Sequence, residues 1–152
     1  MPKLVGEPLE IALETGPDDP EISYLESHAW RIQSPRLVIA NPTSYAEYLH
    51  SSAGEFSCAK GLYVGTRGGW FSDRSACYLA AGRPVVLQAT GFADALPTGE
   101  GLFSVSTVEE AAEAILAIRS EYARHAAAAR ELACEHFASQ QILTYLLKHI
   151  GL

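Results

Sequence analysis

The segment DRSACYLAAGRPVVLQATGF, residues 73–92, is the feature that most constrains the fold. Residues 73–81 have the composition of a helix, with Ser72 as the expected cap and Gly82 as its end. After Pro84 the chain continues at once into an apolar, β-branched run over residues 84–88, which predicts a buried strand. A helix that leads directly into such a strand is typical of parallel sheets, whose strands are covered by helices on both faces.

The remaining sequence alternates in the same way. We expect strands over residues 8–14, 30–32, 55–60 and 102–105, and helices over residues 20–28 and 42–51. The apolar run at residues 37–40 is compatible with a strand or with an extended connection, and residues 61–69 and 90–101 are expected to be loops. The sequence therefore predicts an α/β fold: one Rossmann-like parallel sheet with helices on both faces, in a single domain covering residues 1–152.

The carboxy-terminal third is expected to be helical. Thr107 and Glu110 have the spacing of a capping box, and an apolar stripe follows them to Ile118. A second helix is predicted from near Ser120 to Phe137, with the alanines at 126–129 packed closely, and a third after Ser139. The third helix carries more apolar side chains than one inward stripe requires.

Charge and cysteine usage bear on partners and location. The net charge of -7 disfavours a broad surface for nucleic acid. The chain has neither an apolar run long enough to span a membrane nor the apolar core of a signal peptide at its amino terminus. Cys58 and Cys77 lie in apolar runs, so we expect buried, reduced thiols and a cytoplasmic protein.

Residues 68–74, GGWFSDR, are the first candidate site. Free N–H groups at the start of a helix attract anions such as phosphate, and Arg74 would add a charged fork. Gly68 and Gly69 would allow the backbone to approach a ligand closely. The alternative is that Ser72 caps the helix and Asp73 complements its dipole, with nothing bound.

The run YLHSSAGEFSCAKGLYVGTRGGWFSDRSACYLAAGRPVVLQATGFADALPTGEGLFSVSTVEEAAEAI, residues 48–115, resembles the carboxy-terminal half of a bacterial glycosyltransferase-like protein of the GT-B fold. The resemblance extends back to about residue 25 and forward to the end of the chain. In GT-B enzymes this half binds a nucleotide-sugar donor, and the other half contributes most of the acceptor site. The resemblance therefore implies a nucleoside-diphosphate sugar as donor substrate, a hexosyltransferase-like activity, and no further cofactor or metal.

The resemblance also implies donor-binding residues in three loops. Ser72, Asp73 and Arg74 match the seat of the diphosphate, and Lys60 follows a strand near the expected nucleotide. Trp70 would stack on a base or close the domain cleft, while Phe71 is expected in the core. The loop after the buried strand supplies the remaining candidates for the sugar or phosphate side: Gln88, Thr90, Gly91 and Phe92.

No catalytic residue is assigned from the sequence. Many retaining GT-B enzymes carry two glutamates at positions that here read Gly69 and Cys77, and Ala89 stands where related proteins often have Asp. The five histidines lie on predicted helices, where we expect surface or half-buried positions.

A partner is expected because complete GT-B enzymes are much longer than this chain. The resemblance implies that an acceptor-half protein completes the enzyme, and residues 139–152 are expected to pack on that partner or on a second copy. The alternative is a non-catalytic Rossmann-like binding or assembly module.

Overall fold

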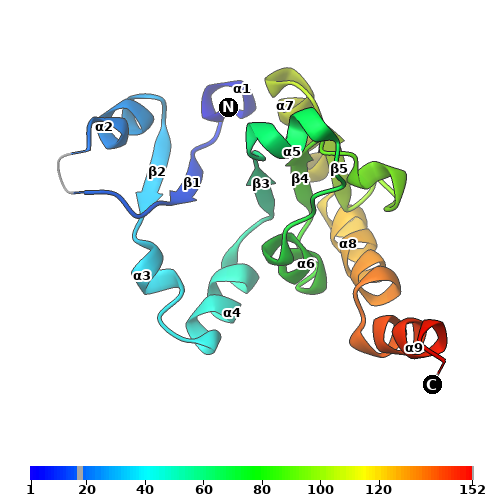
Figure 1. Cartoon of the computed structure of the whole chain (residues 1–152). Helices are drawn as coiled ribbons and strands as arrows, with labels where there is room; N and C mark the ends of the chain where they lie inside the picture. The colour runs from blue at the N-terminus through cyan, green and yellow to red at the C-terminus, as the bar shows by residue number, and fades with distance from the viewer. Residues whose placement is uncertain (17–18, 152) are drawn as a thin grey trace. The chain divides into compact units, whose positions relative to one another are not determined.

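Along the described residues, parallel strands are interspersed with helices up to residue 105, and three consecutive helices follow (Figure 1). The computed structural model describes residues 1–16 and 19–151. The chain divides into two units, Met1–Ser51 and Ser52–Leu152. Within the described residues, five strands form two parallel sheets rather than one continuous sheet. The α/β class with parallel strands is thus confirmed.

The first unit is built on a two-stranded sheet. Strands β1 (Leu9–Ala12) and β2 (Trp30–Gln33) pair in parallel, with Ile11 opposite Ile32. Helix α2 (Pro20–Ser27) connects them, and the Asp19 side chain accepts the Glu21 N–H at 2.9 Å at its start. A short helix, α1 (Pro2–Val5), precedes this arrangement.

Residues 37–40 do not form the strand or extended connection that their apolar composition suggested. Helix α3 (Pro35–Val38) includes the first two of these residues, and a turn follows it. Pro35 explains the difference, because its fixed φ favours the first position of a helix and its missing N–H costs nothing there. Helix α4 (Pro42–Ser51) follows as predicted, and the Asn41 side chain accepts the Ser44 N–H at 2.9 Å.

The second unit contains a three-stranded parallel sheet with strand order β3-β4-β5. Its strands are β3 (Glu55–Ser57), β4 (Val85–Gln88) and β5 (Leu102–Val105). Val85 and Val86 are 0% and 1% exposed, and neighbouring strand residues point to opposite faces. Both faces of β4 are therefore covered, as the sequence predicted for residues 84–88.

The described part of the second unit also contains six helical segments. Helix α6 (Asp73–Ala80) lies between β3 and β4 in the chain, and α7 (Val108–Ser120) packs on β4 and β5. Helix α8 (Tyr122–His136) packs on α6 and α7, and α9 (Ser139–His149) follows it. The capping interaction of α7 is present, since Thr107 Oγ1 accepts the Glu110 N–H at 3.1 Å. The other two segments are α5 (Gly61–Thr66) and the short 3-10 helix η1 (Phe92–Asp94).

Three local expectations in this unit are wrong. Residues 61–66 form helix α5 rather than a loop, although two of the six residues are glycines. Cys58 and Cys77 are exposed rather than buried, because β3 ends at Ser57 and Cys77 lies on the outer side of α6. His125 is 2% exposed, because α8 turns this residue toward the sheet, where its ring packs against Phe103.

The close packing predicted for residues 126–129 is present at Gly101, the residue before β5. A Cβ at Gly101 would lie 2.7 Å from the Ala129 Cα and 2.8 Å from the Ala128 carbonyl carbon. Gly101 also has φ 71°, a left-handed conformation that glycine adopts without strain. Only glycine therefore fits between β5 and α8 without a shift of backbone.

Candidate functional site

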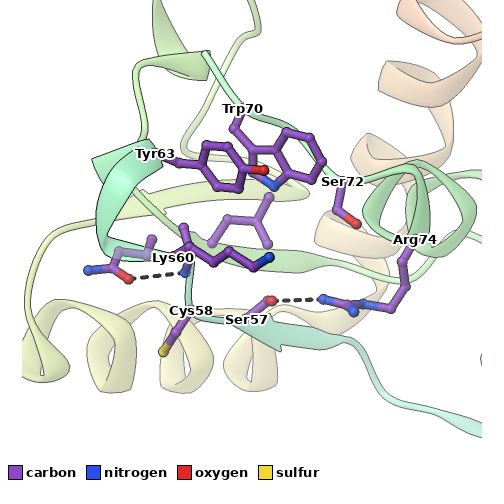
Figure 2. A pocket seen from close by; sticks show the side chains of 10 residues that line it. Ser57, Cys58, Lys60, Tyr63, Trp70, Ser72 and Arg74 are labelled. Carbon is purple, nitrogen blue, oxygen red and sulfur yellow. Dashed lines mark hydrogen bonds between the residues drawn. The ribbon is translucent and has the colours of Figure 1, made fainter. Parts of the chain in front are cut away.

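A hollow of about 250 Å³ opens at the carboxyl ends of β3 and β4 (Figure 2). Ligands of open parallel sheets collect at this edge. Ten residues line the hollow: Ser57, Cys58, Ala59, Lys60, Tyr63, Trp70, Ser72, Arg74, Leu87 and Gln88. Five of the nine residues proposed from the sequence are among them, and they come from three separate segments of the chain.

Two cationic side chains, Lys60 and Arg74, line the hollow. Lys60 directly precedes α5, and Figure 2 shows its amino group extended toward the side of the hollow where Ser72 and Arg74 stand. Among the described residues, no salt-bridge partner is found for the Lys60 amine. None of the ten lining residues is acidic, although the whole chain carries a net charge of -7.

Arg74 is held by residues of β3. Its Nε donates to Glu55 Oε1 at 2.6 Å, and its Nη2 donates to the Ser57 hydroxyl at 2.8 Å. The Glu55 side chain is only 5% exposed, whereas that of Arg74 is 51% exposed. Arg74 therefore neutralises a buried carboxylate, and that ion pair fixes the guanidinium beside the hollow.

The start of α6 differs from the sequence expectation. Ser72 occupies the cap position, but its side chain makes no capping hydrogen bond. The Asp73 carboxylate instead accepts the Arg74 N–H at 2.9 Å, and Asp73 does not line the hollow. The negative charge of Asp73 thus already complements the positive end of this helix.

Trp70 and Tyr63 form an aromatic wall of the hollow. Their rings stack with centroids 4.5 Å apart and planes inclined by 6° (Figure 2). Tyr63 was not predicted from the sequence because it lies on α5, and the two glycines of that helix made the segment read as a loop. Trp70 is 47% exposed, so part of its surface is accessible to a ligand ring.

Gln88, Thr90 and Phe92 make contacts within the protein that support the loops around the hollow. The Gln88 Oε1 accepts the Ala59 N–H at 3.1 Å and so braces the loop after β3. Thr90 and Phe92 are 1% and 2% exposed, and Phe92 makes an edge contact with Phe71. Thr90, Gly91 and Phe92 are not among the lining residues of the hollow.

Comparison with known proteins gives no match: no family model, no curated protein and no solved structure is significantly similar to this chain. In the part of the chain that the structure describes, no three His, Cys, Asp or Glu side chains are grouped to hold a metal ion. None of the described helices is long and apolar enough to cross a membrane.

Proposed function

We propose that the hollow binds the diphosphate of a nucleotide sugar, and that residues 52–151 are a Rossmann-like donor-binding half of a GT-B glycosyltransferase. The observation that carries this proposal is the pair of cationic side chains that line the hollow. Two cationic side chains line it without any acidic one, in a chain with a net charge of -7. Oriented cations beside the carboxyl ends of parallel strands are suited to phosphate groups.

Each part of the wall has a role in this proposal. The Lys60 ammonium pairs with the diphosphate, and the guanidinium of Arg74, oriented by Glu55, contacts the same group. The exposed part of Trp70 stacks on the base. The Ser57 and Ser72 hydroxyls complete the polar surface on the side of Arg74.

Sugar transfer requires groups beyond this hollow. None of its lining residues is a carboxylate or a histidine, which are the usual general acids and bases. We therefore propose a hexosyltransferase activity only for the complex with an acceptor-half protein. The same observation favours the second candidate, a binding module without catalysis. Release of nucleoside diphosphate from a bound nucleotide sugar in the presence of the partner would separate the two.

Lys60→Met is expected to weaken binding of a nucleoside diphosphate about tenfold or more, because a hydrogen bond to a charged group contributes about 1.5–3 kcal/mol. Titration calorimetry with UDP, GDP, ADP and dTDP measures the affinity. Lys148→Met on α9 removes the same charge away from the hollow and serves as the control. Equal affinities for the Lys60→Met variant and the parent would exclude Lys60 from the phosphate site.

We also propose a cytoplasmic location, which agrees with three free thiols in the structure. Reduced cysteines without disulfide partners are usual in that compartment. The proposal does not depend on the exposure of the thiols.

The partner surface that we propose is the apolar face of α9. None of its residues is buried, and Figure 1 shows the helix beyond the end of α8. Six large side chains along it are between 44% and 64% exposed: Ile142, Leu143, Tyr145, Leu146, Leu147 and Ile150. They present on the order of 600 Å² of apolar surface, close to the ~800 Å² per partner of a standard interface.

Charge favours a second copy as the occupant of this face. Glu131 and Glu135 near the end of α8 are exposed, and Lys148 and His149 form the last turn of α9. An antiparallel pair of α9 helices would place the basic end of each copy near the acidic end of the other. Such a two-fold arrangement satisfies both charged ends at once.

We expect the parent chain to dimerise at tens of micromolar, as measured by light scattering. Leu146→Glu should give a monomer that remains folded, because Leu146 is already half exposed in the single chain. Thr144→Glu adds the same charge to the polar side of the same helix and should leave the dimer intact. A monomeric parent would contradict this proposal, whether or not an acceptor-half protein binds α9.

A further inference from the structure

Thr90 and Gly91 lie outside the hollow, yet both contact the loop that carries its aromatic wall. The Thr90 hydroxyl donates to the Trp70 carbonyl at 2.6 Å, and the Gly69 N–H donates to the Thr90 carbonyl at 2.9 Å. Thr90 is 1% exposed, so these two hydrogen bonds are shielded from water. Thr90 thus holds the backbone at two consecutive residues, through the N–H of Gly69 and the carbonyl of Trp70.

Gly91 brings the two loops into contact at the next position. A Cβ on this residue would lie 2.7 Å from the Arg67 carbonyl oxygen, and its φ of 98° is rarely adopted by other residues. Arg67 itself has φ 48° and ends α5, the helix that carries Tyr63. Residues 90–91 thus contact both ends of the 67–70 loop, which connects α5 to Trp70.

We infer that Thr90 and Gly91 are positioning residues of the hollow, which fix the 67–70 loop so that Trp70 stays stacked on Tyr63. Trp70 is 47% exposed and has one ring face against Tyr63, so its own burial is too slight to fix its orientation. The orientation of Trp70 therefore depends on the backbone of the 67–70 loop. The two shielded hydrogen bonds of that backbone are both made to Thr90. This inference rests on the proposed function where it concerns ligand affinity, but the ordering of Trp70 is independent of any ligand.

The test uses Thr90→Val, which keeps the shape of the side chain and removes its hydroxyl, with Thr90→Ser as the conservative control. Both are made in a Trp30→Phe background, in which Trp70 is the only tryptophan. Acrylamide quenching of Trp70 fluorescence should rise at least about twofold in Thr90→Val and stay at the parent value in Thr90→Ser. Affinity for the nucleoside diphosphate that binds the parent should fall about five- to tenfold in Thr90→Val only, the scale of one lost hydrogen bond.

Hydrogen exchange on the parent chain provides a second measurement that needs no variant. We expect the Gly69 amide to exchange slowly, although its loop is exposed, because its N–H is bonded to the buried Thr90. Exchange of Gly69 at the rate of an open loop would overturn the inference. Unchanged quenching in a folded Thr90→Val variant would overturn it as well.

The two proposals fail in different ways. If no nucleoside diphosphate binds the parent, the proposed function fails, while quenching and hydrogen exchange still decide whether Thr90 positions Trp70. If the parent binds and Thr90→Val changes neither quenching nor affinity, the positioning role fails and the proposed function stands.

Discussion

Gly101→Ala is expected to lower the free energy of unfolding by about 2–5 kcal/mol, the largest effect that we predict. The added Cβ would lie 2.7 Å from the Ala129 Cα, and neither β5 nor α8 can move without disturbing the core. Overpacking of this kind costs about 1–3 kcal/mol and occasionally more, and the left-handed backbone adds about 1–2 kcal/mol. Urea unfolding followed by far-UV circular dichroism measures the change.

Gly69→Ala is the matched control for this variant. Gly69 has φ 72°, almost the same as the 71° of Gly101, but a Cβ added at Gly69 would meet no atom within 4 Å beyond its chain neighbours. The control should therefore lose only the backbone contribution of about 1–2 kcal/mol. Equal losses for the two variants would show that α8 does not approach β5 as closely as described.

Arg74→Met is expected to lower the free energy of unfolding by about 1–3 kcal/mol. Glu55 is buried and would lose its charged partner, and loss of one partner from a fully buried pair costs about 3–5 kcal/mol. The smaller figure applies here because the Arg74 side chain is half exposed and solvent screens the pair. Thermal and urea unfolding of the variant measure this loss.

The double variant Glu55→Gln/Arg74→Met separates pairing from packing. Once the carboxylate is neutral, the loss of the guanidinium should matter much less, so the double variant should recover most of the stability. If Arg74→Met is as stable as the parent, Glu55 does not depend on Arg74. The orientation of the guanidinium toward the hollow would then lose its explanation.

Local signals in the sequence predicted most of the strands and helices, but not the division of the strands into two sheets. The apolar run at residues 84–88 predicted a strand covered on both faces, and the spacing of Thr107 and Glu110 predicted the start of α7. Both the strand and the helix start depend on residues that are close together in the sequence, so the sequence alone reveals them. Helix α5 was missed because its glycines disfavour a helix locally, whereas the stacking of Tyr63 on Trp70 supports it from outside the helix.

The site was predictable in its location but not in its contacts. Parallel topology places the ends of β3 and β4 at one edge, which brings Lys60 and Arg74 together. The pairing of Arg74 with Glu55 depends on the register between a strand and a helix, across residues that are 19 positions apart. Neither residue type nor spacing shows that register. The sequence therefore predicted Arg74 only as a ligand for an anion and not as the partner of Glu55.

The most direct test of the central claim is to locate a bound nucleoside diphosphate by NMR on the uniformly nitrogen-15-labelled chain. We predict saturable amide shifts confined to the segments that line the hollow, residues 57–63, 70–74 and 87–88. The amide of Ala59, bonded to Gln88, should be among those that move. Absence of any shift up to millimolar UDP, GDP, ADP and dTDP, or shifts centred elsewhere in the chain, would contradict the claim that the hollow is a diphosphate site.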